Sequence, residues 1–213
     1  MKKARKQFIA PLPCDQGTVK ENGFALTEFL ISTVIVLGLS AGVFSMLTNV
    51  LSTSGYQTEV LSVMEHTRVA MSTIERYIVQ AGNNPRSAAF TPVTITSATQ
   101  VQLCSDLTGS AGGNQGDADG DISDANENIT IRYNSTGRSI ELVAADGTVR
   151  TLAEYISGFA LEYLDKNGSA TTVGADVRTI RITINGTSAV ANAHTRKTFG
   201  LTLTGVATLP NRG

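Results

Sequence analysis

The longest uninterrupted run of apolar residues lies near the start of the chain. Residues 29–47, FLISTVIVLGLSAGVFSML, contain no charged side chain. At about 1.5 Å of rise per residue, a helix of this length approaches the roughly 30 Å hydrocarbon thickness of a bilayer. The pattern therefore predicts a single membrane-spanning helix.

The helical pattern continues beyond this run, but on one face only. Apolar residues recur three and four positions apart, as expected for an amphipathic helix. These residues are Leu61, Met64, Ala70, Met71, Ile74 and Ile78. Gly82, followed by Asn-Asn-Pro at 83–85, is typical of a helix end. We expect one long helix from about Phe24 to Ala81, and whether it is interrupted at Ser52 to Gly55 stays open.

After Pro85 the pattern changes to short segments typical of β-strands. The expected strands are 93–96, 101–103, 129–133, 139–143, about 155–164, 178–184 and 199–208. Hairpin signals stand at 135–137, 146–147, 167–168 and 185–186. In RTIRITI (178–184), Ile180, Ile182 and Ile184 share one face. The segments predict a mostly antiparallel sheet packed on the long helix, which is an α+β fold.

The distribution of charge gives the helix an orientation. Four basic residues precede the apolar run, and by the positive-inside rule they keep the N-terminus in the cytoplasm. They are Lys2, Lys3, Arg5 and Lys6. The chain beyond about residue 50 would then lie on the far side of the membrane. The net charge is −1, so the sequence indicates no basic surface for nucleic acid.

Three other classes of apolar segment fit the sequence less well. A secretory signal peptide places its basic residues directly before a shorter apolar run, whereas polar residues 14–22 intervene here and no small-residue cleavage site follows. A buried core helix is rarely so uniformly apolar. A simple signal anchor accounts for the hydrophobicity but not for the presence of Glu28.

Glu28 is costly at this position. A carboxylate in lipid costs on the order of 3 kcal/mol or more, and no Lys or Arg stands between Glu28 and Arg68. A cut between Gly23 and Phe24 would create a free α-amino group at Phe24. Pairing of Glu28 with that amine on a neighbouring subunit would satisfy both charges, which points towards assembly.

The stretch GFALTEFLISTVIVLGLSAGV (23–43) resembles the N-terminal motif of type IV prepilins and type II secretion pseudopilins, in which a glycine precedes a hydrophobic first mature residue and a glutamate stands fifth. Gly23, Phe24 and Glu28 match these positions. The resemblance implies cleavage after Gly23 by a membrane prepilin peptidase, methylation of the Phe24 amine, and registration of subunits by Glu28. Ala25 and Thr27 depart mildly from the usual Thr and Ile, and the leader is long.

The resemblance divides the chain into three parts. They are a cleaved leader (1–23), a transmembrane and filament-core helix (24–50), and an extracytoplasmic pilin-like α+β domain (51–213). Expected partners are other pilin or pseudopilin subunits, the prepilin peptidase and an inner-membrane assembly platform. The expected location is the bacterial inner membrane as a single-pass precursor, and then a pilus or pseudopilus.

A second resemblance narrows the class. FALEYLDKNG (159–168), then RTIRITI and a final threonine-rich strand, are similar to PilW-type minor pilins and J-type pseudopilins. This implies a minor pilin that primes or caps a filament, and no enzymatic activity. A J-like minor pseudopilin of type II secretion, a membrane-anchored periplasmic binding domain and a secreted enzyme remain alternatives. Major pilins usually close a loop with two cysteines, whereas loss of Cys14 with the leader leaves Cys104 alone.

The one site-like group of residues is acidic. GNQGDADGDISDANENIT (113–130) carries five carboxylates around Gly120 and no basic residue; they are Asp117, Asp119, Asp121, Asp124 and Glu127. Carboxylates alternating around a glycine turn can converge on Ca²⁺ as in EF-hand-like loops, although the glycine comes one ligand position early. The sequence therefore predicts a calcium site, and a solvated acidic loop is the alternative.

No catalytic set is evident in the sequence. His66 and His194 lack a nucleophile or metal partner nearby in sequence, and we expect both at the surface. GSAGGNQG (109–116) lacks the Lys-Ser/Thr and the following helix of a phosphate-binding loop. Cys104 stands in a strand-like run and is expected to be a buried structural thiol.

Overall fold

The fold consists of one long helix followed by short strands. The computed structural model describes residues 26–107, 118–124, 126–192 and 195–211. Helix α1 spans Leu26–Gln80, and a short 3₁₀ helix, η1, spans Gly174–Asp176. The strands are β1 (Val93–Ser97), β2 (Gln100–Cys104), β3 (Asn128–Asn134), β4 (Ser139–Val143), β5 (Val149–Ala153), β6 (Ile156–Leu164), β7 (Thr179–Thr187) and β8 (Gly200–Thr208). The α+β prediction is confirmed.

Helix α1 runs without a break through Ser52–Gly55. A glycine in a helix interior costs about 1 kcal/mol relative to alanine, which is too little to interrupt a helix of this length. The predicted end is confirmed, because Gly82 has a positive φ of 78°. Its amide donates to the carbonyl of Cys104 at 2.9 Å, so the helix end is tied to β2.

The second half of α1 buries a narrow stripe. The buried residues are Val63, Thr67, Ala70, Met71, Ile74 and Ile78. Leu61 was expected on this face but is 65% exposed. At about 100° per residue, Leu61 lies some 200° around the helix from Val63, and it therefore points away from the stripe.

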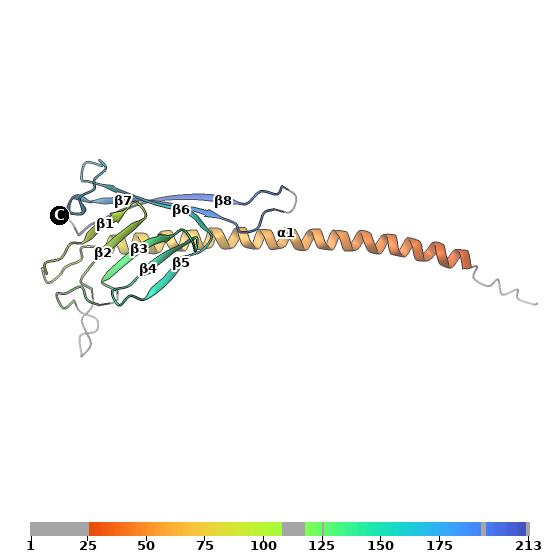
Figure 1. Ribbon diagram of the computed structural model, residues 1–213, viewed down its shortest axis with the longest axis horizontal. Coiled ribbons are helices and arrows are strands. Elements are labelled where there is room, and N and C mark those ends of the chain that lie inside the picture. The colour runs from red at the N-terminus through yellow and green to blue at the C-terminus, as the bar shows by residue number, and fades with distance from the viewer. Residues whose placement is uncertain (1–25, 108–117, 125, 193–194, 212–213) are drawn as a thin grey trace, which may run out of the picture. The chain divides into compact units, whose positions relative to one another are not determined.

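The strands form two antiparallel sheets beside the second half of α1 (Figure 1). The first sheet has the order β1-β2-β3-β4-β5, and the second has the order β6-β7-β8. Strand β5 was not predicted. Its sequence, VRTLA, does not alternate, and its first three residues are exposed. The hydrophobic pattern therefore carried no signal for it.

The hairpin predictions have mixed outcomes. Residues 135–137 connect β3 to β4, residues 146–147 connect β4 to β5, and residues 167–168 form a turn after β6. The turn predicted at Asn185-Gly186 is wrong, because both residues lie inside β7. Gly186 pairs with Ile156 on one side and Leu201 on the other.

One core joins α1 to both sheets. Ile180, Ile182 and Ile184 are fully buried, which confirms the alternation predicted for β7. The core also includes Ile74, Ile78, Val101, Ile131, Ile140, Ile156 and Phe159. Tyr163 of β6 links the sheets, since its hydroxyl donates to the carbonyl of Ser97 at 2.9 Å. Helix α1 and both sheets therefore share one hydrophobic core and form a single α+β body.

Candidate functional site

The first half of α1 is apolar and uncovered. Every side chain from Leu26 to Ser52 is exposed, and no part of its most hydrophobic window is buried by the rest of the described chain. Soluble monomers rarely expose a contiguous apolar surface of this size. By length and composition α1 could cross a membrane, which is consistent with a single-pass anchor.

Two threonine hydroxyl groups in this half form hydrogen bonds within the helix. Thr33 donates to the carbonyl of Phe29 at 2.7 Å, and Thr48 donates to the carbonyl of Ser45 at 2.9 Å. A helix in lipid must satisfy its polar groups internally because no water is present to do so. These two side chains are therefore compatible with a hydrocarbon environment.

Glu28 stands in the first turn of α1 and is exposed. It has no hydrogen-bond or ion-pair partner within the described part of the chain. No further charged residue follows it until Glu59. A carboxylate is favourable at a helix N-terminus. The apolar half that follows Glu28 contains no Lys or Arg that could pair with it. Gly23 and Phe24 of the predicted processing site lie outside the described residues.

The predicted calcium ligands divide into two kinds. Asp119 and Asp121 make local turns: Asp119 Oδ1 accepts from the Asp121 amide at 3.1 Å, and Asp121 Oδ1 accepts from the Ser123 amide at 2.8 Å. Gly120 makes the turn with φ of 95°. Asp117 lies outside the described residues. Among described residues, no three His, Cys, Asp or Glu side chains lie close enough to hold a metal ion.

Glu127 differs from Asp119 and Asp121 because it is fully buried, whereas Asp119 is partly exposed and Asp121 is exposed. Its Oε1 accepts from the Leu107 amide at 2.7 Å. Asp106, which no sequence motif marks, is fully buried beside this contact. Its Oδ2 accepts from the Gly120 amide at 3.1 Å. Asp106 stands eleven positions before Asp117, directly after a strand-like run. Its contact with the acidic segment therefore comes from the fold and is not visible in the sequence.

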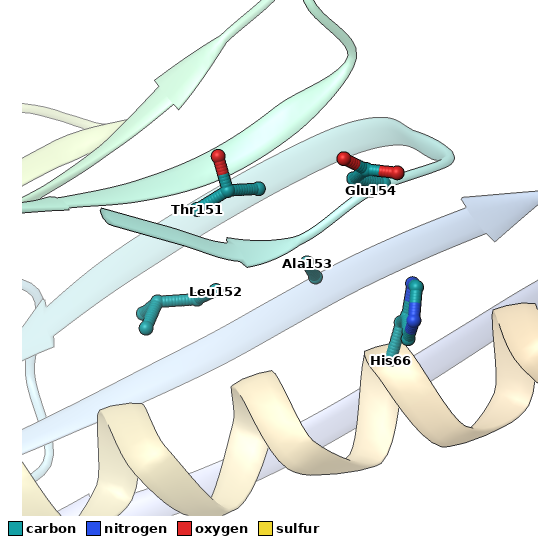
Figure 2. Close-up of a pocket in the computed structure, with 5 residues that line it drawn as sticks. All are labelled: His66, Thr151, Leu152, Ala153 and Glu154. Atoms are coloured by element: carbon teal, nitrogen blue, oxygen red, sulfur yellow. The ribbon is translucent and has the colours of Figure 1, made fainter. Parts of the chain in front are cut away.

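A shallow pocket lies between α1 and the β5 region (Figure 2). It is lined by His66, Thr151, Leu152, Ala153 and Glu154. His66 is half-buried rather than fully on the surface, and its ring stacks on Tyr155 at 6.3 Å between centroids. No hydrogen bond joins His66 to Thr151 or Glu154, so these residues do not form an acid–base pair.

Cys104 is buried at the end of β2, as predicted. Burial raises the pKa of its thiol, which disfavours the reactive thiolate. The residue therefore packs as a small apolar side chain. Cys14 and His194 lie outside the described residues.

Comparison with known proteins leaves the family open. No protein-family model matches the chain, and no curated protein matches its sequence. The α+β body and a helix able to cross a membrane are the two established properties on which a function can be proposed.

Proposed function

We propose that this chain is a structural and assembly subunit of the type IV pilin class, a minor pilin that primes or caps a filament. The proposal rests on one observation: the two halves of the continuous helix α1 have different surroundings. Its first half is apolar, uncovered and marked by the single charge of Glu28. Its second half is built into the α+β body.

This division suits a subunit that moves from lipid into a filament. In the membrane, the apolar half is solvated by acyl chains. In a filament, the same surface packs against helices of neighbouring subunits. Glu28 then gains a cation if the chain has been cut after Gly23, because the new amine at Phe24 supplies a positive charge.

The minor role rests on the second resemblance, over residues 159–184 and the final strand. A J-like pseudopilin of a type II secretion system shares these features, and a membrane-anchored periplasmic binding domain shares the anchor. Proteins that co-purify with the chain distinguish these alternatives. A minor pilin should bring pilus subunits with it, a J-like pseudopilin should bring secretion-system pseudopilins, and a binding domain should bring neither.

The mature N-terminus is the most direct test. Mass spectrometry of the chain purified from membranes should find Phe24 as the first residue, carrying one added methyl group. An intact Met1, or a cut beyond residue 45, would exclude the pilin class.

Glu28→Ala tests the pairing argument. We expect the variant to be cleaved and folded but absent from filaments, because the incoming subunit has lost the partner of the Phe24 amine. Ser32→Ala is the matched control on the same helix and should assemble as the wild-type chain does. Undiminished incorporation of Glu28→Ala would contradict the proposed role of Glu28.

A further inference from the structure

Two carboxylates are fully buried at the base of the acidic segment. Asp106 follows β2, Glu127 precedes β3, and both have zero exposure. Removing a charged carboxylate from water is strongly unfavourable unless another group compensates it. The partners of Asp106 are therefore the question, because one of its oxygens lacks a hydrogen bond among the described residues.

Asp106 is only half satisfied by the described part of the chain. Its Oδ2 accepts from the Gly120 amide at 3.1 Å, whereas its Oδ1 has no hydrogen-bond partner among the described residues. The ion pairs between described residues are Arg132–Glu141 and Arg181–Glu162, and neither includes Asp106. The buried Asp106 side chain therefore points towards the acidic segment, and its Oδ1 accepts no hydrogen bond from the described residues.

The surrounding sequence supplies no positive charge. Residues 105–128 contain six Asp or Glu residues and no Lys, Arg or His. The side chain of Arg86 lies against Gly120, but Arg86 is exposed and does not form an ion pair with Asp106. No described cation therefore forms an ion pair with Asp106.

The backbone holds the two carboxylates on one framework. The Ser105 amide donates to the carbonyl of Glu127 at 2.9 Å, and the Leu107 amide donates to its Oε1. Glu127 therefore bonds to the residues on both sides of Asp106. The Asp106 amide in turn donates to the carbonyl of Asn83 at 2.8 Å, beyond the end of α1. These hydrogen bonds hold the backbone on both sides of Asp106, so its carboxylate can be presented to an ion.

We propose that Asp106 and Glu127 bind a calcium ion at the base of the acidic segment. Calcium takes six to eight oxygen ligands, which include backbone carbonyls and water as well as carboxylates. Two carboxylates match its charge, and its flexible coordination suits an irregular loop. Asp121 is outside this site, because it is exposed and its carboxylate already caps Ser123. The proposal is independent of the pilin assignment.

The test uses the full-length chain in a mild detergent, stripped of metal with a chelator. Equilibrium dialysis should find one bound calcium ion per chain. At 100 times the dissociation constant, binding should raise the midpoint of thermal unfolding by about 5–10 °C, measured by circular dichroism. Magnesium should give a smaller shift, because it demands regular octahedral coordination.

Matched variants locate the ion. Asp106→Asn should lose both the bound ion and the thermal shift, whereas Asp121→Asn removes the same charge from an exposed position and should retain both. Should Asp106→Asn fail to fold, Glu127→Gln and the stoichiometry of the wild-type chain decide the question.

Two results would overturn the proposal. One is a wild-type chain that binds no calcium in equilibrium dialysis. The other is an Asp106→Asn or Glu127→Gln chain that binds calcium as the wild type does.

Discussion

Gly186 shows at the scale of one residue how close α1 approaches β7. A Cβ atom at this position would lie 2.8 Å from Thr67 Oγ1 and 2.9 Å from Val63 Cγ1. Thr67 cannot easily move, because its side chain is short, buried and bonded to the carbonyl of Val63 at 2.7 Å. Gly186 is therefore required for contact between helix and sheet, not for a turn.

Gly186→Ala should lower the free energy of unfolding by about 1–3 kcal/mol, as overpacked sites commonly do. Urea titration followed by circular dichroism measures the change. Gly200→Ala, at the start of β8, is the control, because a methyl group added there would meet no atom of the described residues within 4 Å. Equal stability of the two variants would show that the helix and sheet can separate without cost.

Glu141 is a second residue whose environment sets its behaviour. Its carboxylate accepts hydrogen bonds from Asn134 at 2.8 Å and from Arg132 at 2.9 Å. The hydrogen bond from Asn134, followed by that from Arg132, lowers the pKa of Glu141 below its usual value. Because the folded pKa is depressed, the stabilisation is present above the unfolded pKa of about 4.5 and is lost as pH falls through the folded pKa.

Glu141→Gln should flatten part of the decline in stability below about pH 4.5. The effect should be on the order of 0.5–1 kcal/mol, since Arg132 is partly exposed and water screens the pair. Urea unfolding at several values between pH 6 and pH 3 measures it. Parallel pH profiles for the variant and the wild type would contradict the assignment.

At the scale of an element, α1 fixes the segment that joins β7 to β8. The Glu59 carboxylate accepts hydrogen bonds from the amides of Ala189 and Val190. Charged acceptors make hydrogen bonds about twice as strong as neutral ones. This contact anchors the segment to a turn of the helix that lies before the buried stripe.

Glu59→Ala should release this segment without unfolding the body. We expect trypsin to cut after Arg196 or Lys197 several times faster, while the midpoint of thermal unfolding changes by only a few degrees. Glu65→Ala, which removes an exposed carboxylate from the same helix, should be cut at the wild-type rate. Unchanged proteolysis of Glu59→Ala would show that other contacts hold the segment.

At the scale of the whole molecule, the two halves of α1 differ in burial. The chain divides into compact units at Thr48 and Asn49, and the buried apolar core begins only at Val63. The described residues before Asn49 therefore add nothing to the core of the body.

A chain that begins at Asn49 should fold and remain soluble without detergent, with a thermal midpoint within a few degrees of the full chain. A chain that begins at Ala70 loses Val63 and Thr67 and should be destabilised by several kcal/mol. Circular dichroism and size-exclusion chromatography compare them. Aggregation of the first truncated chain would show that the apolar half also supports the body.

Local patterns determined much of the architecture by themselves. The apolar run could be identified from its own residues alone. The alternation of Ile180, Ile182 and Ile184 correctly predicted the buried face of β7. Gly82 ended the helix where a positive φ was required. These features depend on residues adjacent in the chain, so their signals are visible in the sequence.

Contacts between distant residues were decided only by the tertiary structure. Strand β5 exists because β4 pairs with it, and Gly186 lies in a strand because it pairs with both β6 and β8. The buried pair Asp106 and Glu127 stands twenty-one positions apart in sequence. Their burial depends on how β2, β3 and the end of α1 pack together, which no local pattern records.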